Sequence, residues 1–192
     1  MALRTNLFDS TTFKVVEINN VLALRTGHIL SQIELPKAKY LGGSESYIEN
    51  GAILFLDVNG KFATRNQLTT TDTDDYLKPF LLYNEELMTG PYTDLKYFAE
   101  VFDENNKAYP RALALNVGDA FTSNNYVMAS GVAFADGLYG TINASGKIEV
   151  NSALPSGAYQ GPLFAAVVSD LPDGTTDAYE FTVIDLNAVF VS

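Results

Sequence analysis

Short apolar runs bounded by turn-forming residues make up most of this chain, and the clearest of them lies near residue 50. Residues 52–56 are continuously apolar, with Glu49-Asn50-Gly51 before them and Asp57-Val58-Asn59-Gly60 after them. An Asn-Gly pair supplies the positive φ that a tight hairpin turn requires. The pattern over residues 47–62 therefore predicts a β-hairpin.

Comparable runs recur along the chain, with turn signals about every ten residues, which is typical of all-β sandwiches and barrels. Strands are expected within 13–35 and over 80–83, 162–168 and 178–191. A helix over 21–35 also fits the spacing, but Gly27 and the β-branched residues favour strand.

Residues 95–102 fit either a helix or a strand. A hairpin-type turn follows them, and residues 108–115 then form another strand-like run. We favour a strand over 95–102, with 108–115 as its hairpin partner.

A weaker copy of the first hairpin pattern returns at residues 138–150. Gly60-Lys61 corresponds to Gly146-Lys147, an offset of 86 (146 − 60), and Pro79-Phe80 corresponds to Pro162-Leu163, an offset of 83 (162 − 79). The two offsets differ by three residues, and this difference falls within a loop, where changes in length cost little free energy. We interpret this as a duplicated hairpin–loop–strand unit, although unrelated hairpins with Gly-Lys after a turn would look alike.

The predicted fold is therefore all-β, with two small related β-barrel or β-sandwich lobes built from hairpins. The first lobe would span residues 14–92 and the second 93–192, after an N-terminal arm at residues 1–13. A single compact domain is the alternative, since 192 residues suit either arrangement.

Composition and charge exclude several classes of function. The net charge of −11 and the scattered arginines argue against nucleic-acid binding. The absence of cysteine excludes disulfides, thiolate chemistry and Cys-type zinc sites. The first residues contain no apolar signal core, and no run approaches the length of a membrane span, so we expect synthesis in a cytoplasm and no membrane partner.

No catalytic constellation stands out. His28 is the single histidine, and no nucleophile motif accompanies it, so a Ser-His-Asp triad is not expected. The adjacent carboxylates at Glu85-Glu86 and Asp103-Glu104 would point to opposite faces of a strand and could not share a substrate. We therefore expect no enzymatic activity and no cofactor.

Acidic loops raise the question of calcium. Asp72, Asp74 and Asp75 form one cluster, and Asp170, Asp173 and Asp177 form another. Neither has the turn glycine and the bidentate glutamate of an EF-hand loop. Solvated loops are the favoured interpretation, and no metal site is predicted.

Tyrosines are frequent and could line a carbohydrate platform. More often, a tyrosine in a β-protein packs its ring on the core and leaves its hydroxyl in water. The absence of Trp weakens the sugar-stacking interpretation. Asn143-Ala144-Ser145 matches a glycosylation sequon but is better interpreted as a hairpin turn.

Two segments together resemble a known family. YIENGAILFLDVNGKFA followed by KPFLLYNEEL, and then LKYFAEVFDENNKAYPRALALNVGDAFTSNNY, resemble the auxiliary or decoration proteins of tailed-bacteriophage heads. In that family an ENG turn leads into an apolar strand and a G-K return, and a block of the form F…NK…RAL.L..GD.F follows. The resemblance spans residues 47–183 and leaves residues 1–40 uncovered. The block is carried here by Phe102, Asn106, Lys107, Arg111, Ala112, Leu113, Leu115, Gly118, Asp119 and Phe121.

The resemblance implies a structural virion protein that binds the outer surface of a phage capsid and cements or decorates the major-capsid lattice. The expected partners are the major capsid protein and neighbouring copies on that lattice, and the expected location is the capsid exterior. The candidate contacts are loop 63–78 and four residues of the arm, namely Leu3, Arg4, Leu7 and Phe8. A carbohydrate- or receptor-binding fibre or spike module, or a tail or baseplate component, are the alternatives.

Overall fold

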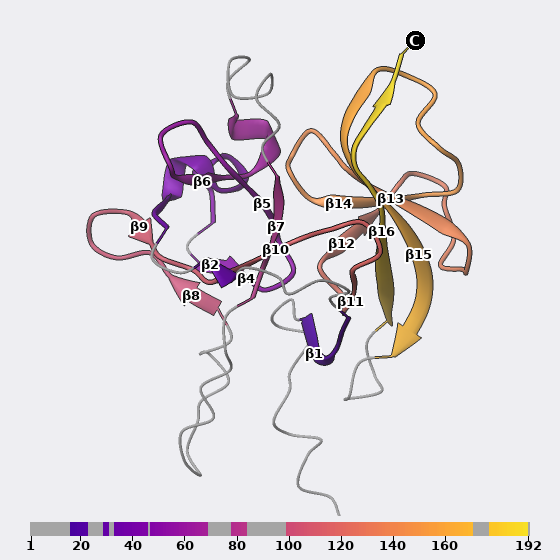
Figure 1. Cartoon of the computed structure of the whole chain (residues 1–192), viewed down its shortest axis with the longest axis horizontal. Coiled ribbons are helices and arrows are strands. Elements are labelled where there is room, and N and C mark those ends of the chain that lie inside the picture. The colour runs from indigo at the N-terminus through magenta and orange to yellow at the C-terminus, as the bar shows by residue number, and fades with distance from the viewer. Residues whose placement is uncertain are drawn as a thin grey trace, which may run out of the picture.

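The computed structural model describes residues 16–22, 29–30, 33–45, 47–68, 78–83, 99–170 and 177–191. Within these residues the protein is mostly β, as predicted (Figure 1). The predicted N-terminal arm at residues 1–13 lies outside them. Within the same ranges, the protein contains no helix that is long and apolar enough to span a membrane.

A five-stranded antiparallel sheet contains the predicted hairpin of residues 47–62. The hairpin is formed by β5 and β6, with Phe55 opposite Ala63 and Leu56 opposite Phe62. Its turn covers residues 57–60, so the prediction is confirmed. The sheet order is β2 (Ile29–Leu30), β10 (Ala112–Ala114), β7 (Pro79–Leu82), β5 (Ile53–Leu56) and β6 (Phe62–Ala63).

Both faces of this sheet are buried. Ile53 and Phe55 of β5 belong to one apolar core, whereas Leu54, between them, belongs to a second core on the opposite face. Successive side chains of a strand point to opposite faces, so a strand buried on both sides must be continuously apolar. This explains why residues 52–56 lack the polar alternation of a half-exposed strand.

The second large sheet has seven strands and curls into a half-barrel. Its last strand, β12, begins three residues after β11 ends, with the buried residues Asn124 and Asn125 between them. One chain segment therefore supplies strands at both sides of the curl. The sheet order is β1 (Val16–Leu22), β11 (Ala120–Ser123), β16 (Asp177–Phe190), β15 (Tyr159–Asp170), β13 (Leu138–Ile142), β14 (Ile148–Asn151) and β12 (Tyr126–Met128).

One core lies between the two sheets, and aromatic rings dominate it. Phe121 of β11 has its ring centroid 5.6 Å from that of Phe181 and 6.0 Å from that of Phe164. Full burial of a Phe side chain stabilises a fold by roughly 1.5–3 kcal/mol. These rings, together with Ile53, Phe55 and Leu81 from the five-stranded sheet, hold the two sheets against each other.

The second core lies on the other face of the five-stranded sheet, under two short strand pairs and two turns of 3₁₀ helix. Tyr40 and Leu35 are buried there beside Phe62 and Phe80, whose ring centroids are 5.6 Å apart. The covering elements are the pair β3 (Leu35–Pro36) and β9 (Lys107–Ala108), the pair β4 (Tyr47–Glu49) and β8 (Ala99–Val101), and the 3₁₀ turns η1 (Lys37–Lys39) and η2 (Leu41–Gly43).

Other strand predictions meet a mixed outcome. The strands expected over 80–83, 162–168 and 178–191 are present as β7, β15 and β16, and residues 138–150 form the hairpin β13–β14. The expected pairing of 95–102 with 108–115 is wrong. Within 95–102 the strand β8 pairs with β4, while β9 and β10 pair with β3 and β7. Long-range partners displace the local hairpin because each completes a buried sheet.

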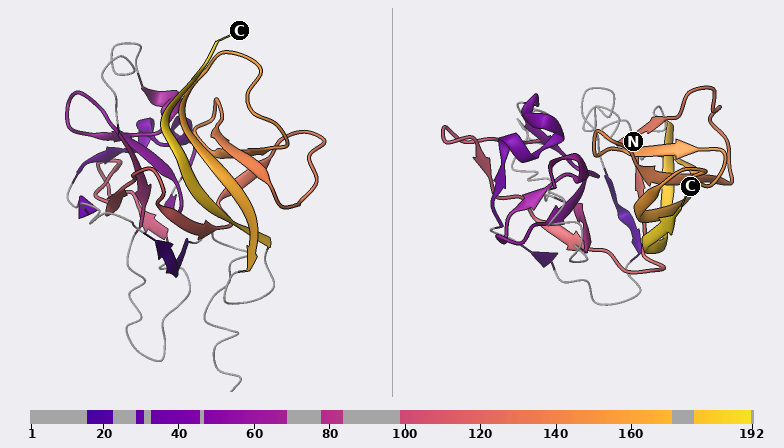
Figure 2. Two further views of the ribbon diagram at one scale, coloured as in Figure 1. Left: turned by 45° about the vertical axis from the view of Figure 1, so that its right-hand side comes forward. Right: turned by 90° about the horizontal axis from the view of Figure 1, so that it is seen from above.

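The strand pairings cross the predicted lobe boundary at residues 92 and 93. Strand β10, from the C-terminal segment, lies between β2 and β7, and β1, from the N-terminal segment, joins the curled sheet. Figure 2 shows β1, in indigo, beside strands coloured orange and yellow. The division into lobes at 14–92 and 93–192 stays a prediction, and any such lobes would exchange strands.

The internal echo has a structural counterpart. Strand β5 lies between β6 and β7, and β13 lies in the same way between β14 and β15. The hairpin registers also agree, because Leu56 faces Phe62 and Ile142 faces Ile148, both at the offset of 86. The predicted correspondence of the two hairpins thus extends to their registers and to the strand on their other side.

One turn geometry occurs three times within the described residues, at 57–61, 103–107 and 143–147. In each, a carboxylate or amide oxygen of the first residue accepts hydrogen bonds from the backbone N–H groups of the third and fifth residues, at 2.8–3.1 Å. The fourth residue has positive φ, with values of 72° for Gly60, 57° for Asn106 and 83° for Gly146. This is the αL residue of a hairpin loop with a type I turn and a bulge. The fifth residue is lysine each time.

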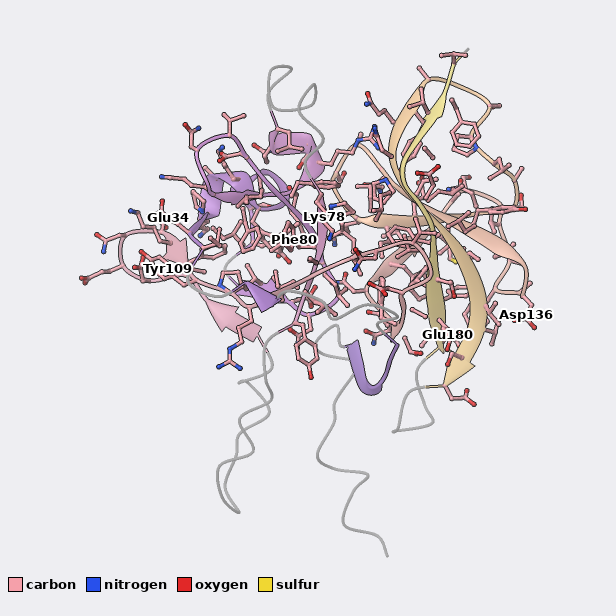
Figure 3. The ribbon with its side chains drawn as sticks, in the orientation of Figure 1. Glu34, Lys78, Phe80, Tyr109, Asp136 and Glu180 are labelled. Atoms are coloured by element: carbon pink, nitrogen blue, oxygen red, sulfur yellow. The ribbon has the colours of Figure 1, made fainter. Side chains whose placement is uncertain are left out.

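Two of these turn lysines hold one carboxylate. Lys61 Nζ is 2.7 Å from Glu34 Oε1, and Lys107 Nζ is 2.9 Å from Glu34 Oε2. These hydrogen bonds hold the pKa of Glu34 below its usual value. Glu34 therefore connects two turns that belong to distant parts of the chain (Figure 3).

Candidate functional site

A polar seam joins the five-stranded sheet to the curled sheet. Arg65, in the 3₁₀ turn η3 (Arg65–Gln67) after β6, donates from Nη1 to the backbone oxygen of Ile142 at 3.2 Å. Its guanidinium carbon lies 4.5 Å from the ring centroid of Tyr159. The cation–π contact and the hydrogen bond together place Arg65 across the two sheets.

Tyr159 is fixed from the other side. Its hydroxyl donates to the oxygen of Pro162 at 2.6 Å and accepts from the N–H of Ile142 at 3.0 Å. Burial raises the pKa of this phenol, so the hydroxyl stays protonated at neutral pH. The hydroxyl proton of Tyr159 is used in the hydrogen bond to Pro162 and is not available for acid–base chemistry.

The seam is closely packed at the turn of residues 143–147. Gly146 has a φ of +83°, and a Cβ added to it would lie 2.8 Å from the Cβ of Thr64. Thr64 is itself fully buried. At another point of the seam, Asn125 Nδ2 donates to the backbone oxygen of Asn50 at 2.8 Å. The two sheets therefore meet through specific polar contacts as well as through the apolar core.

An open groove of about 720 Å³ lies beside the seam. Glu149 and Arg65 are the charged residues that line it, and the Glu149 carboxylate has no hydrogen-bond partner among the described residues. Asn66, Asn143 and Asn151 contribute amides. The segment 152–158 also lines the groove. Such a lining can accept a neutral, hydrogen-bonding ligand.

A second surface lies on the long hairpin β15–β16. Inward-facing residues such as Phe164 and Phe181 enter the shared core, and the residues between them point away from it. Val167 is 46% exposed and lies directly opposite Glu180, while Ile184 is 43% exposed. We call the outward-facing positions Ala165, Val167, Thr182 and Ile184 the outer strip.

A β-bulge interrupts the pairing of β15 and β16 at Ile184, at one end of the outer strip. Val183 pairs with Phe164, but Asp185 pairs with Leu163, so Ile184 is an additional residue in β16. Val183 and Leu186 both contact the shared core. The bulge thus leaves two consecutive residues, Ile184 and Asp185, exposed to solvent, where strict alternation would turn one of them inward.

The outer strip lies among carboxylates, and no described lysine or arginine pairs with them. From residue 112 to the C-terminus the chain has one lysine, Lys147, and eight Asp or Glu residues, a net charge of −7 out of the total of −11. Asp170 lies directly opposite Asp177 at the end of the hairpin. Figure 3 shows Glu180 and Asp136 on this side of the molecule. The described carboxylates of β15 and β16 form no ion pair.

The residues predicted as capsid contacts cannot be placed, because Leu3, Arg4, Leu7 and Phe8 lie outside the described residues. The predicted surface loop 63–78 is wrong at its start. Thr64 is fully buried and Arg65 belongs to the seam, while residues 69–77 lie outside the described residues.

Most of the chemical candidates also lie outside the described ranges. These are His28, Asp72, Asp74, Asp75, Asp173, Glu85 and Glu86. Asp103 is described, and its carboxylate accepts two backbone hydrogen bonds in the second of the repeated turns. Within the described residues, no group of three His, Asp or Glu side chains could hold a metal ion.

The described tyrosines do not gather into one exposed platform. Tyr40 and Tyr179 are buried in different cores, and Tyr126 packs edge-on against Tyr179 at 5.0 Å. Tyr109, which is half-exposed, lies in a different part of the chain. The sequon at Asn143 is a hairpin turn, as predicted.

Sequence reasoning missed two functional candidates, the seam arginine and the outer strip. Arg65 lies in a polar stretch that resembles an ordinary loop, so nothing local marks its contact with Tyr159. The outer strip carried a signal that was readable in the sequence, namely the absence of lysine and arginine after residue 147.

Comparison with known proteins returned no relative: no family model, no curated protein and no solved structure matches this chain.

Proposed function

We propose that this chain is a structural virion protein that binds the outer surface of a phage capsid and cements or decorates the major-capsid lattice. The observation that carries the proposal is the place of the resemblance block, Phe102 to Phe121, in the fold. It begins with the repeated turn at 103–107, continues through β9, which pairs with β3, and β10, which lies between β2 and β7 in the five-stranded sheet, and ends at Phe121 in the shared core. The residues that carry the resemblance to head decoration proteins thus include two members of the core between the sheets, Leu115 and Phe121.

The construction of the molecule supports a role in bearing mechanical stress. Two sheets share an aromatic core, and polar contacts such as Arg65–Tyr159 and Asn125–Asn50 bridge them. A protein that holds a lattice against internal pressure needs such a body and a docking surface, and needs no active site. We propose further that the units β6–β5–β7 and β14–β13–β15 arose by duplication, which would give two related lobes.

The test is binding to expanded, undecorated capsids of the phage that encodes the protein. Labelled protein is expected to bind with a saturating stoichiometry, to be displaced by unlabelled protein, and to appear as added density on the outer surface in electron micrographs. Capsids already saturated with unlabelled protein serve as the control. If the protein fails to bind undecorated shells at micromolar concentrations, the proposal is refuted.

A second candidate function is carbohydrate binding, as in a fibre or spike module, and the groove beside the seam favours it. The Glu149 carboxylate, which has no hydrogen-bond partner among the described residues, and the amides of Asn66, Asn143 and Asn151 suit the hydroxyls of a neutral sugar. A glycan array with the protein and with Glu149→Ala tests this function. Binding of a defined glycan that is lost in the variant would support it, and an array without specific signals would exclude it for the glycans tested.

A further inference from the structure

The outer strip combines two properties that are unfavourable in a protein standing alone. It exposes Val167 and Ile184 on neighbouring strands, which leaves aliphatic surface in water. It also sets Glu180 and Asp185 beside these residues, with no lysine or arginine in residues 148–192 to balance them. Like charges that face each other across strands are destabilising, as for Asp170 and Asp177.

A basic partner would resolve both problems at once. Aliphatic contact at the centre of an interface removes the exposed valine and isoleucine from water, and cations at its rim face the carboxylates. The same charges oppose a second copy of this chain as the occupant. A two-fold dimer through this face would set carboxylates against carboxylates.

We propose that the outer strip is a docking surface for a protein whose contact area has aliphatic side chains at its centre and Lys or Arg around them. This inference rests on the proposed function, under which the partner is the outer surface of the capsid shell. From Val167, which lies opposite Glu180, to Ile184 the outer strip covers about four residue steps along β16, or roughly 13 Å at about 3.3 Å per residue.

The variant that tests the centre of the strip is Val167→Lys with Ile184→Lys. Lysine at position 167 would face Glu180 across the strands, which favours the fold, but it would place a cation against a basic partner. The matched control is Val117→Lys, which makes the same change at a 57%-exposed valine in the turn before β11. Equal urea midpoints for the three proteins establish that folding is unchanged.

We expect the strip variant to bind undecorated capsids at least tenfold more weakly than the unmodified protein, and the control to bind within twofold. A tenfold loss corresponds to about 1.4 kcal/mol. If the unmodified protein binds and the strip variant binds equally well, the docking surface is refuted while the proposed function stands. If the unmodified protein does not bind, both are refuted.

Salt dependence provides a measurement on the unmodified protein, which does not depend on the folding of any variant. Rim charges are screened as ionic strength rises, so capsid affinity should fall several-fold between 50 and 500 mM salt, concentrations at which the screening length shortens from roughly 14 to 4 Å. The double neutralisation Glu180→Gln with Asp185→Asn should flatten this dependence. An affinity that is constant or rises with salt, or an unchanged slope in the neutralised protein, would overturn the basic-partner assignment.

Discussion

The repeated turn provides a quantitative test of how burial sets the strength of one interaction. The first residues of the three turns make the same two hydrogen bonds, but Asp57 is buried, Asn143 is half-buried and Asp103 is exposed. Asp57 also pairs with Lys39. We therefore expect alanine at these positions to destabilise the fold in the order 57, then 143, then 103.

The magnitudes follow from what each truncation leaves behind. Asp57→Ala removes a charged acceptor of two backbone N–H groups and leaves Lys39 without its partner, so the free energy of unfolding should fall by about 3 kcal/mol. Asp103→Ala exposes the same amides to water, which replaces the lost bonds, and should cost about 0.5–1 kcal/mol.

The assay is urea unfolding at pH 7, followed by far-UV circular dichroism, with the midpoint and slope compared among the variants. Equal losses at positions 57 and 103, or a reversed order, would refute the idea that burial decides the effect. A change in slope would instead indicate an altered unfolded state and would exclude that variant from the comparison.

Asp57→Asn separates the turn from the ion pair. Burial raises the pKa of Asp57, but hydrogen bonds from Lys39 and from the amides of Lys61 and Asn59 outweigh it, so the pKa lies below its usual 3.8. The carboxylate therefore stabilises the fold above about pH 4, and this contribution is lost as the pH falls through the lowered pKa. Asparagine keeps the acceptor, as Asn143 does naturally, so the variant should lose less than Asp57→Ala and should show a shallower decline in acid.

Two further predictions concern packing and pH. Gly146→Ala should lower the free energy of unfolding by about 3 kcal/mol, because the φ of this residue is +83° and the added Cβ would meet Thr64. Gly131→Ala should lower it by only about 1 kcal/mol, because Gly131 has a similar φ of +79° but open space around it. Thermal melts of the two variants measure the difference, and equal losses would contradict the close approach at Gly146. Burial first, and then the nearby Tyr179 and Asp177, raise the pKa of Tyr126 to about 12, so the free energy of unfolding should fall as the pH rises from 10 towards 12. In urea titrations at alkaline pH, Tyr126→Phe should show a smaller fall. An identical pH profile for the two proteins would contradict the role of Tyr126.

The elements that could be predicted from sequence are those whose structure is set by neighbouring residues. The turns at 57–61 and 143–147 follow from a side-chain acceptor, a glycine with positive φ and the strands on either side. The turn at 103–107 has Asn106 in place of glycine at the position with positive φ, so its sequence does not show that it matches the other two turns.

The pairing of distant strands could not be predicted. The strand β10 has the short sequence Ala112-Leu113-Ala114, and nothing in it distinguishes a partner at β7 from one at β8. The choice depends on which arrangement buries both faces of the central sheet, and that is a property of the whole core.

The candidate docking surface could be predicted only in part. The alternation of Tyr179, Phe181 and Val183 as core residues already places Ile184 on the outer face, but it would turn Asp185 inward. The bulge at Ile184 leaves Asp185 exposed as well, and nothing local in the sequence marks the extra residue. The charge pattern, in contrast, was visible from the absence of lysine and arginine after Lys147.

The place of β10 between β2 and β7 also constrains the order of assembly during synthesis. Among the described strands, β2 pairs only with β10, and Glu34 has both of its lysine partners only once Lys107 is in place. A nascent chain that has emerged only to residue 92 thus has the hairpin β5–β6 but no route to the finished five-stranded sheet. Completion must wait until residue 114 has left the ribosome, so the N-terminal half is expected to depend on the C-terminal half for its own fold.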